Sequence, residues 1–313
     1  MSEAFATSLE RTKVPAALLG SLGGVLLGKD RELRLALACL LARGHLLIDG
    51  PPGVGKTTLA QGLSIALGLE FRRVQFTSDL LPADVLGVSV YDRQSERFRF
   101  HPGPIFTQVL LADEINRAPP RTQSALLEAM EERQVTVEGQ AHALPFPFFV
   151  IASQNPQQQV GTFPLPESQL DRFLVRLKLD HPDAAAERAL LEGDGGRHGL
   201  ERLEAQLQGD SLADLQAGAE AVHVAPALLD YVQAILAETR DPGRFLGGLS
   251  PRAGLGLVAL SRAWAYLHDR SEVLPEDVQA VLPSLVEHRL LALDAGLGRA
   301  GLGAALIESV AIP

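Results

Sequence analysis

Residues 49–58 of this chain have the sequence DGPPGVGKTT. They follow the short apolar run at residues 46–48, which predicts a buried strand, and they lead into apolar residues at helical spacing. A strand, the pattern Gly-x-x-x-x-Gly-Lys-Thr and a helix together form a phosphate-binding loop. A glycine-rich turn with a solvated lysine is the plain alternative, and the complete spacing with both flanks argues against it.

Each residue type in this stretch has a chemical reason to be there. The glycines at 50, 53 and 55 allow a tight turn and a close approach of the backbone N–H groups to a phosphate. Lys56 supplies a positive charge for the β- and γ-phosphates, and Thr57 supplies a hydroxyl for Mg²⁺, which prefers oxygen ligands. We therefore expect ATP and Mg²⁺ as cofactors, with a nucleotide-binding set of Pro52, Gly53, Val54, Gly55, Lys56, Thr57 and Thr58.

A second motif, VLLADE, spans residues 109–114. Its apolar part predicts a buried strand with two carboxylates at the C-terminal end, the edge at which open α/β sheets bind ligands. We expect Asp113 to hold Mg²⁺, directly or through water, and Glu114 to orient and deprotonate the attacking water. Alone, the pair would suggest a strand end with an acidic turn, but its place after the phosphate loop favours catalysis.

A third apolar run, residues 148–152, predicts a strand that brings Asn155 to the same edge. An amide at that place can hydrogen-bond the γ-phosphate or the attacking water. Without the other two motifs, Asn155-Pro156 would be interpreted as an ordinary turn.

The remaining pattern predicts two parts. Residues 1–182 are expected to form an α/β domain with a parallel sheet, interrupted by hairpins at about 87–101 and about 134–144. A hinge is expected at 180–182, and residues 183–313 are expected to form a smaller, all-helical domain with a flexible loop at 193–199.

Composition limits the possible partners and location. The formal net charge of −10 removes the electrostatic attraction that drives non-specific binding to nucleic acid, so nucleic acid is an unlikely partner. The apolar stretch at 14–27 is too short to span a bilayer, and we expect a cytosolic protein, where ATP is available. The single cysteine, Cys39, lies in an apolar helical run and is expected to be a buried thiol.

Three further positions have both a plain and a functional interpretation. Arg172 follows a short predicted helix and precedes a strand, where it forms either a surface ion pair or a cation for the phosphate of a neighbouring subunit. Arg252 falls in the first turn of a helix capped by Ser250, an unfavourable place for a cation that indicates a functional role. The segment around Gly28 either packs on the nucleotide base or simply connects two helices.

Taken together, these motifs resemble those of the MoxR family of AAA+ ATPases. The resemblance covers roughly residues 20–290, and Ser78 stands where relatives often have proline. The stretches that carry it are QFTSDLLP (75–82), LLADEINRAPP (110–120), QNP (154–156), GTFPLPE (161–167), LDRF (170–173), GLSPRA (248–253), VLPEDV (273–278) and EHR (287–289).

The resemblance implies an αβα sandwich with a helical lid, two inserted hairpins and assembly into a ring, usually a hexamer. By motif position it implies that Asn155 is sensor 1, Arg172 the arginine finger and Arg252 sensor 2, whereas Gly28 belongs to the adenine-side loop. Whether Arg252 acts on the nucleotide of its own subunit or of a neighbour stays open. Arg117 and Arg121 also lie near the sheet edge and remain alternatives for the arginine that acts on a neighbour.

The resemblance also implies a chaperone-like remodeller that matures or activates a client protein complex, often with a partner that carries a von Willebrand factor A domain. A nucleic-acid motor or loader, a Mg-chelatase-like subunit and a non-hydrolysing switch are the alternatives. The acidic charge argues against the motor. Glu114 argues against the switch, which has no need of a residue that activates water.

Overall fold

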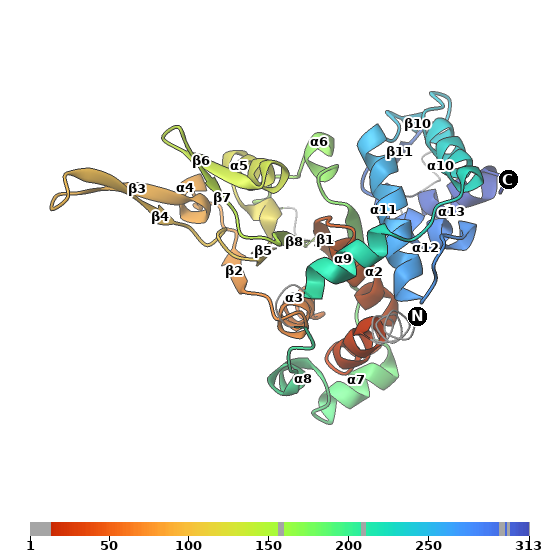
Figure 1. The fold of residues 1–313 in the computed structure, drawn as a ribbon, viewed down its shortest axis with the longest axis horizontal. Helices are drawn as coiled ribbons and strands as arrows, with labels where there is room; N and C mark the ends of the chain where they lie inside the picture. Colours follow the sequence, from red (N-terminus) through yellow and green to blue (C-terminus); the bar gives the residue numbers. More distant parts are fainter. Residues whose placement is uncertain (1–13, 156–159, 208–210, 294–297, 299–300, 313) are drawn as a thin grey trace, which may run out of the picture.

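A computed structural model describes residues 14–155, 160–207, 211–293, 298 and 301–312 (Figure 1). At its centre is a parallel sheet with the strand order β2-β5-β8-β1-β9. The apolar runs predicted as strands all lie in it. The strands are β1 (Leu46–Asp49), β2 (Phe71–Gln75), β5 (Val109–Asp113), β8 (Phe149–Gln154) and β9 (Val175–Lys178).

The register of the sheet brings the predicted motifs to one edge. Asp49, the last residue of β1, pairs with Gln154 at the end of β8, and Gln75 at the end of β2 pairs with Asp113. Since all five strands are parallel, their C-terminal ends form a single edge at which ligands of α/β sheets bind.

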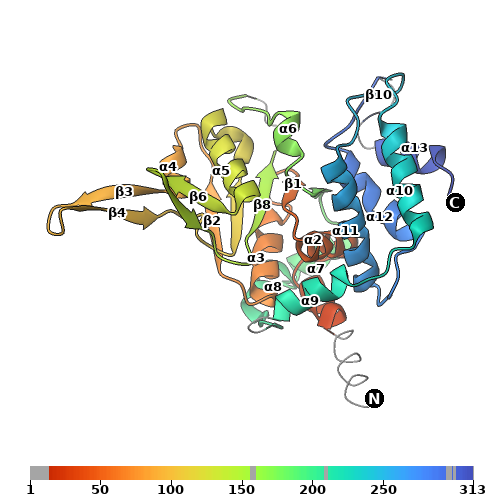
Figure 2. The same cartoon turned by 45° about the horizontal axis from the view of Figure 1, so that its top comes forward.

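Helices cover both faces of the sheet, so it is the middle layer of three (Figures 1 and 2). One apolar core includes Ile48 and Leu111 with α2 and α3, and the other includes Leu47 and Leu110 with α5. The side chains alternate between these cores because successive residues of a strand point to opposite faces. The helical elements up to β9 are α2 (Asp30–Leu41), α3 (Lys56–Ala66), α4 (Pro82–Leu86), the 3-10 turn η1 (Ile115–Arg117), α5 (Pro120–Glu132) and α6 (Glu167–Leu170).

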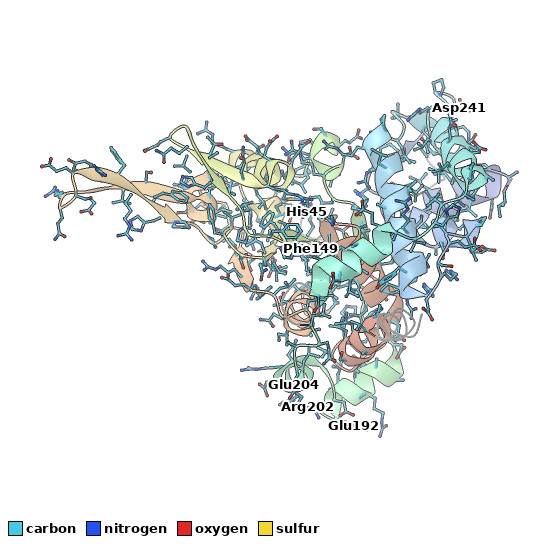
Figure 3. The ribbon with its side chains drawn as sticks, in the orientation of Figure 1. His45, Phe149, Glu192, Arg202, Glu204 and Asp241 are labelled. Carbon is cyan, nitrogen blue, oxygen red and sulfur yellow. The ribbon has the colours of Figure 1, made fainter. Side chains whose placement is uncertain are left out.

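Two aromatic side chains pack together where the central strands begin. His45, just before β1, stacks on Phe149 of β8 with ring centroids 6.4 Å apart, and both are labelled in Figure 3. His45 is nearly buried.

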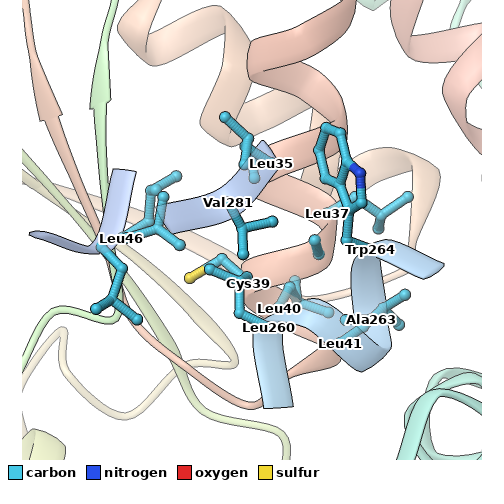
Figure 4. Close-up of a cluster of buried hydrophobic side chains, with 14 of the residues drawn as sticks. Leu35, Leu37, Cys39, Leu40, Leu41, Leu46, Leu260, Ala263, Trp264 and Val281 are labelled. Carbon is cyan, nitrogen blue, oxygen red and sulfur yellow. The ribbon is translucent and has the colours of Figure 1, made fainter. Parts of the chain in front are cut away.

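The C-terminal part is helical apart from one short strand pair, β10 (Phe245–Leu246) with β11 (Leu291–Ala292). Its core is continuous with that of the sheet: Cys39 of α2 lies in the same cluster as Leu260 of α11 and Val281 of α12 (Figure 4). No helix in the described part of the chain combines the length and apolarity needed to cross a membrane. The helices are α7 (Ala184–Leu191), α8 (Gly196–Arg202), α9 (Ser211–Glu220), α10 (Pro226–Thr239), α11 (Pro251–Leu267), α12 (Pro275–Val286) and α13 (Leu302–Ser309).

Part of the segment predicted as a flexible loop at 193–199 is helical, because α8 begins at Gly196. The backbone N–H of Gly196 donates to the carbonyl of Val25 at 2.8 Å, and a Cβ at Gly199 would lie 3.1 Å from the carbonyl oxygen of Gly24. The glycines therefore allow close packing onto the segment before α2. α8 lies beyond the predicted boundary at residue 182, yet it also contacts α3, which precedes that boundary. The domain boundary therefore remains a prediction.

Both predicted hairpins are present. The first, β3 (Gly87–Asp92) with β4 (Arg97–Pro102), projects far from the body in Figures 1 and 2, and the second is β6 (Gln134–Val137) with β7 (Gln140–Ala143). Phe100 stacks on His142 of the second hairpin with ring centroids 4.0 Å apart. Phe98, nearer the tip, is 64% exposed. One phenylalanine thus connects the two hairpins, and the other faces solvent.

Candidate active site

The loop between β1 and α3 has the backbone that its glycines allow. Gly53 and Gly55 have φ of 84° and 96°, values that favour glycine. A Cβ at Gly50 would lie 2.3 Å from the carbonyl oxygen of Leu179, and a Cβ at Gly55 would lie 2.7 Å from Leu26 Cδ1. A larger residue at 50 would therefore force the backbone to move, whereas at 55 it would displace the Leu26 side chain and strain the positive φ.

Lys56 begins α3 and is 9% exposed. Its Nζ donates a hydrogen bond of 2.7 Å to the carbonyl of Gly50, across the loop. Burial lowers the pKa of Lys56, although the carboxylates of Asp113, Glu114 and Asp49 act in the opposite direction. A buried ammonium at a glycine-rich loop that leads into the N-terminus of a helix is well suited to bind an anion.

Asp113, at the end of β5, is 7% exposed, and both of its carboxylate oxygens accept hydrogen bonds. Oδ1 accepts from Ser153 Oγ, whereas Oδ2 accepts from Arg73 Nε at 3.1 Å and from Arg73 Nη2. Neither Ser153 nor Arg73 is among the predicted site residues. Arg73 lies on the edge strand β2 next to β5, so the polar residues of β2 were the available signal.

Glu114 has a left-handed backbone with φ of 55°, which is uncommon outside glycine and is often found at functional sites. Its N–H donates to Ser153 Oγ at 2.9 Å. Its Oε2 accepts from Gln75 Nε2 at 2.9 Å and from Arg117 Nη1 at 3.0 Å. The side chain is thus held at the sheet edge by an amide and a guanidinium, and Gln75 is a further residue that the sequence analysis missed.

Asn155 directly follows β8 and is 5% exposed. The preceding carbonyl, that of Gln154, accepts from the Gly50 N–H at 3.3 Å and from Lys56 Nζ at 3.4 Å. Asn155 is therefore held beside the phosphate loop, as the strand pattern predicts. The next residue of the motif, Pro156, lies outside the described residues.

The donor set fits a magnesium nucleotide. Thr57 and Asp113 offer a hydroxyl and a carboxylate, both oxygen ligands of the kind that Mg²⁺ prefers. Among the described residues no three His, Cys, Asp or Glu side chains form a metal-binding group. Mg²⁺ at this edge would accordingly depend on phosphate oxygens and water for most of its ligands, as it usually does.

The segment around Gly28 lies next to the same loop. Gly28 has φ of 68°, and a Cβ there would lie 3.0 Å from the Cβ of Ala186 in α7. Leu26 reaches Gly55, as described above. This segment therefore packs between the phosphate loop and α7. Its contact with a nucleotide base remains a prediction.

Comparisons with known proteins agree with this geometry. A family model described as "ATPase family associated with various cellular activities (AAA)" matches residues 45–175, and one described as "AAA lid domain" matches residues 237–300. The chain is 40% identical to the Mycobacterium tuberculosis protein "Chaperone MoxR1", over 85% of this chain and 73% of that protein. It is 36% identical to "Protein MoxR" of Paracoccus denitrificans, over 86% of each.

The chain belongs to the MoxR family of AAA+ ATPases. It is also 43% identical to the protein YeaC of Bacillus subtilis, over 85% of this chain and 83% of that one. A solved structure of a putative ATPase from Cytophaga hutchinsonii superposes with a TM-score of 0.89 at 30% identity, covering 100% of this chain and 98% of the other. The predicted fold class and family are thereby confirmed.

In this MoxR-family chain the two predicted arginines meet at one carboxylate. Arg172 Nη2 lies 3.1 Å from Glu131 Oε2, and Arg252 Nη2 pairs with Glu131 Oε1. They line a cavity of about 440 Å³ that also includes Gly44 and His45, just before β1. Since the phosphate loop follows the other end of β1, these arginines and the loop lie at opposite edges of the sheet.

A second carboxylate anchors the segments that carry both arginines. Asp171 Oδ1 accepts from Arg289 Nε at 2.7 Å, and Asp171 Oδ2 accepts from Ser250 Oγ at 3.2 Å. Ser250 is the N-cap of α11, as the sequence predicts, and its hydroxyl also accepts from the N–H of Ala253. Three separate MoxR-like motifs, LDRF, GLSPRA and EHR, therefore converge on Asp171.

The alternative arginines have different positions. Arg117 pairs with Glu114 at the C-terminal edge of the sheet, as described above. Arg121 is an exposed residue near the start of α5.

Proposed function

We propose that this protein is an Mg-ATP hydrolase. Lys56 and the loop Pro52–Thr58 bind the phosphates, Thr57 and Asp113 hold Mg²⁺, and Asn155 contacts the γ-phosphate or the attacking water. Mg²⁺, when bound, offsets the charge of the phosphates. Glu114 accepts a proton from the water as it attacks, a step in which positioning and charge matter most.

The observation that carries this proposal is the placement of Glu114. It stands at the same sheet edge as the buried Lys56, and Gln75 and Arg117 hold its side chain through Oε2. A nucleotide switch that does not hydrolyse would have no use for a carboxylate held in this way.

We further propose that Arg172 and Arg252 act on the nucleotide of a neighbouring subunit in a ring, with a hexamer as the expected size. The support is topological. Arg172 precedes β9, which runs parallel to β1, so Arg172 is at the start of the strands and the phosphate loop is at their end. A cation supplied from a neighbour is worth about 10³–10⁵ in rate in related phosphoryl-transfer sites.

Turnover and nucleotide binding measured on two variants test the catalytic assignment. Glu114→Gln should bind ATP like the wild type and lose turnover by on the order of 10²–10⁴-fold, because it removes the base and keeps the phosphate cradle. Lys56→Ala should lose binding itself. Wild-type turnover by Glu114→Gln would overturn the assignment of Glu114, and a wild-type protein without ATPase activity would overturn the proposed function.

For the biological role we propose a cytosolic, chaperone-like remodeller that matures or activates a client protein complex, with a von Willebrand factor A domain protein as partner. A relative named chaperone, at 40% identity, supports this class. Affinity capture with Glu114→Gln in the presence of ATP should retain such partners, since the variant binds ATP and its partners but does not release the partners by hydrolysing ATP. Recovery of nucleic acid in place of protein would favour the motor alternative.

A further inference from the structure

Glu131 is the carboxylate at which two arginines of different segments meet. It lies near the C-terminal end of α5, on the sheet domain, whereas Arg172 follows α6 and Arg252 belongs to α11. Each arginine takes one of its oxygens. Because a carboxylate has only two oxygens, both guanidinium groups are brought to neighbouring positions.

Other contacts already fix the backbone positions of the two arginines. Arg172 follows Asp171 in the chain, and Arg252 lies in the first turn that Ser250 caps; Asp171 and Ser250 are hydrogen-bonded to each other. Arg289, whose side chain is 6% exposed, completes this anchor through Asp171. What remains free to vary is the direction of the two long side chains, and Glu131 determines that direction.

Charge makes such a carboxylate necessary. The cavity holds three further arginines, Arg43, Arg133 and Arg289, and one further carboxylate, Asp171, which pairs with Arg289. Arginines therefore outnumber carboxylates around the guanidinium groups of Arg172 and Arg252. The hydrogen bond from Arg252 lowers the pKa of Glu131, and the charges of Arg172 and Arg252 contribute, so Glu131 is ionised at neutral pH. Without its negative charge the two guanidinium groups would repel each other and separate.

We infer that Glu131 is a positioning residue that keeps Arg172 and Arg252 together as one unit, ready for the phosphate of a neighbouring subunit. The inference rests on the proposed function. A carboxylate presents two adjacent oxygens, one for each guanidinium, and a phosphoryl group presents adjacent oxygens in the same way. The phosphate of the neighbour carries more negative charge than Glu131 and replaces it as the anion that both guanidinium groups bind. Neither arginine side chain then has to change its direction to reach the phosphate.

Comparing Glu131→Gln with Glu132→Gln tests this inference. The substitution at 131 keeps the size and removes the charge, and Glu132 is the adjacent exposed glutamate on the same helix. At a protein concentration that assembles rings, Glu131→Gln should lower kcat about fivefold, the equivalent of about 1 kcal/mol, with KM and ATP affinity unchanged. Glu132→Gln should behave like the wild type, and Glu131→Asp should recover part of kcat.

Mixed rings separate positioning from a plain structural role. Glu131→Gln mixed with Lys56→Ala should regain turnover, because the Lys56→Ala subunit offers an intact arginine pair to an intact phosphate loop. Arg172→Ala mixed with Lys56→Ala is the reference. The inference would be overturned if Glu131→Gln had the same kcat as Glu132→Gln. It would also be overturned if mixing restored turnover in the reference pair but not in the pair with Glu131→Gln. Both outcomes would leave the proposed function intact. Failure of the reference pair despite subunit exchange would overturn the trans action on which the inference depends.

Discussion

Arg73 donates two hydrogen bonds to a single oxygen of Asp113, the carboxylate expected to hold Mg²⁺. The other oxygen of Asp113 accepts from Ser153. A cation on β2 thus already binds one oxygen of the carboxylate that would hold the metal ion. Binding of Mg²⁺ at Asp113, directly or through water, requires Arg73 to turn away or to accept a second positive charge nearby.

We therefore expect Arg73→Gln to lower the Mg²⁺ concentration needed for half-maximal ATP binding, by about two- to tenfold. The range is modest because the Arg73 side chain is 48% exposed and solvent screens its charge. Fluorescent ATP titrated at several Mg²⁺ concentrations measures the shift without any turnover.

Arg72→Gln is the matched control, since Arg72 is the preceding residue and pairs with exposed Glu70. It should leave the Mg²⁺ dependence unchanged. A higher Mg²⁺ requirement in Arg73→Gln would show that Arg73 orients Asp113 for the metal, contrary to this prediction.

The long hairpin offers a prediction about client contact. Phe98 is exposed and packs edge-on against Tyr91, with centroids 5.4 Å apart, while Phe100 is tied to the second hairpin through His142. Phe98→Ala should therefore leave basal ATPase activity unchanged and reduce the protein partners captured by the Glu114→Gln variant. Removal of residues 88–100 should have the same effect, and more strongly.

Leu191→Ala serves as the control, because Leu191 on α7 is an 84% exposed apolar residue far along the chain from the hairpin. It should change neither activity nor capture. Equal loss of ATPase activity and partner capture on removing residues 88–100 would instead make the hairpin a part of the catalytic body.

Local sequence predicted which residues meet at the C-terminal edge of the sheet, for a physical reason. The apolar runs before Lys56 and before Asp113 are typical of inner strands of a parallel sheet, and parallel strands end at one edge. Their motif residues therefore meet there. No site role was predicted for Gln75 or Ser153, because a polar residue at the end of a strand has no spacing pattern that distinguishes it from an ordinary loop residue.

The far edge of the sheet was harder to foresee. Arg172, Arg252 and Glu131 come from segments separated by up to 121 positions, and no periodicity connects them. The unfavourable place of Arg252 in a first helical turn predicted a functional role, which remains a prediction, and it did not reveal that Glu131 pairs with Arg252. Gly199 was similar: the sequence suggested flexibility, whereas tertiary packing on Val25 makes that segment helical.

The single cysteine provides a probe of unfolding. Cys39 is fully buried in the core of Figure 4, and burial raises the pKa of its thiol. We expect no reaction with a disulfide reagent in the native state and labelling only at the rate of unfolding. Leu191→Cys adds an exposed thiol and should be labelled at once. Rapid labelling of wild-type Cys39 would show that α2 opens far more easily than its packing indicates.

His45 should make stability depend on pH. Burial lowers the pKa of His45 to about 4, against an ordinary value of 6.5. Its Nδ1 accepts from the Val150 N–H at 3.0 Å, which the neutral ring alone can do, and Nε2 faces the carbonyl of Met130 at 3.4 Å. Between pH 6.5 and about 4 the unfolded chain binds the proton and the folded protein does not. The contribution to stability is therefore fully present above pH 6.5 and is lost as the pH falls towards 4.

Urea unfolding at pH 7 and pH 5 measures this loss, which is on the order of a few kcal/mol at most. His45→Asn should be less stable at pH 7 and should lose less free energy of unfolding between the two pH values, since it removes the titrating ring. His223→Asn, at an exposed histidine, should keep the wild-type pH dependence. If His45→Asn loses as much free energy between pH 7 and pH 5 as the wild type, the proton is bound elsewhere and His45 is not the neutral, buried ring described above.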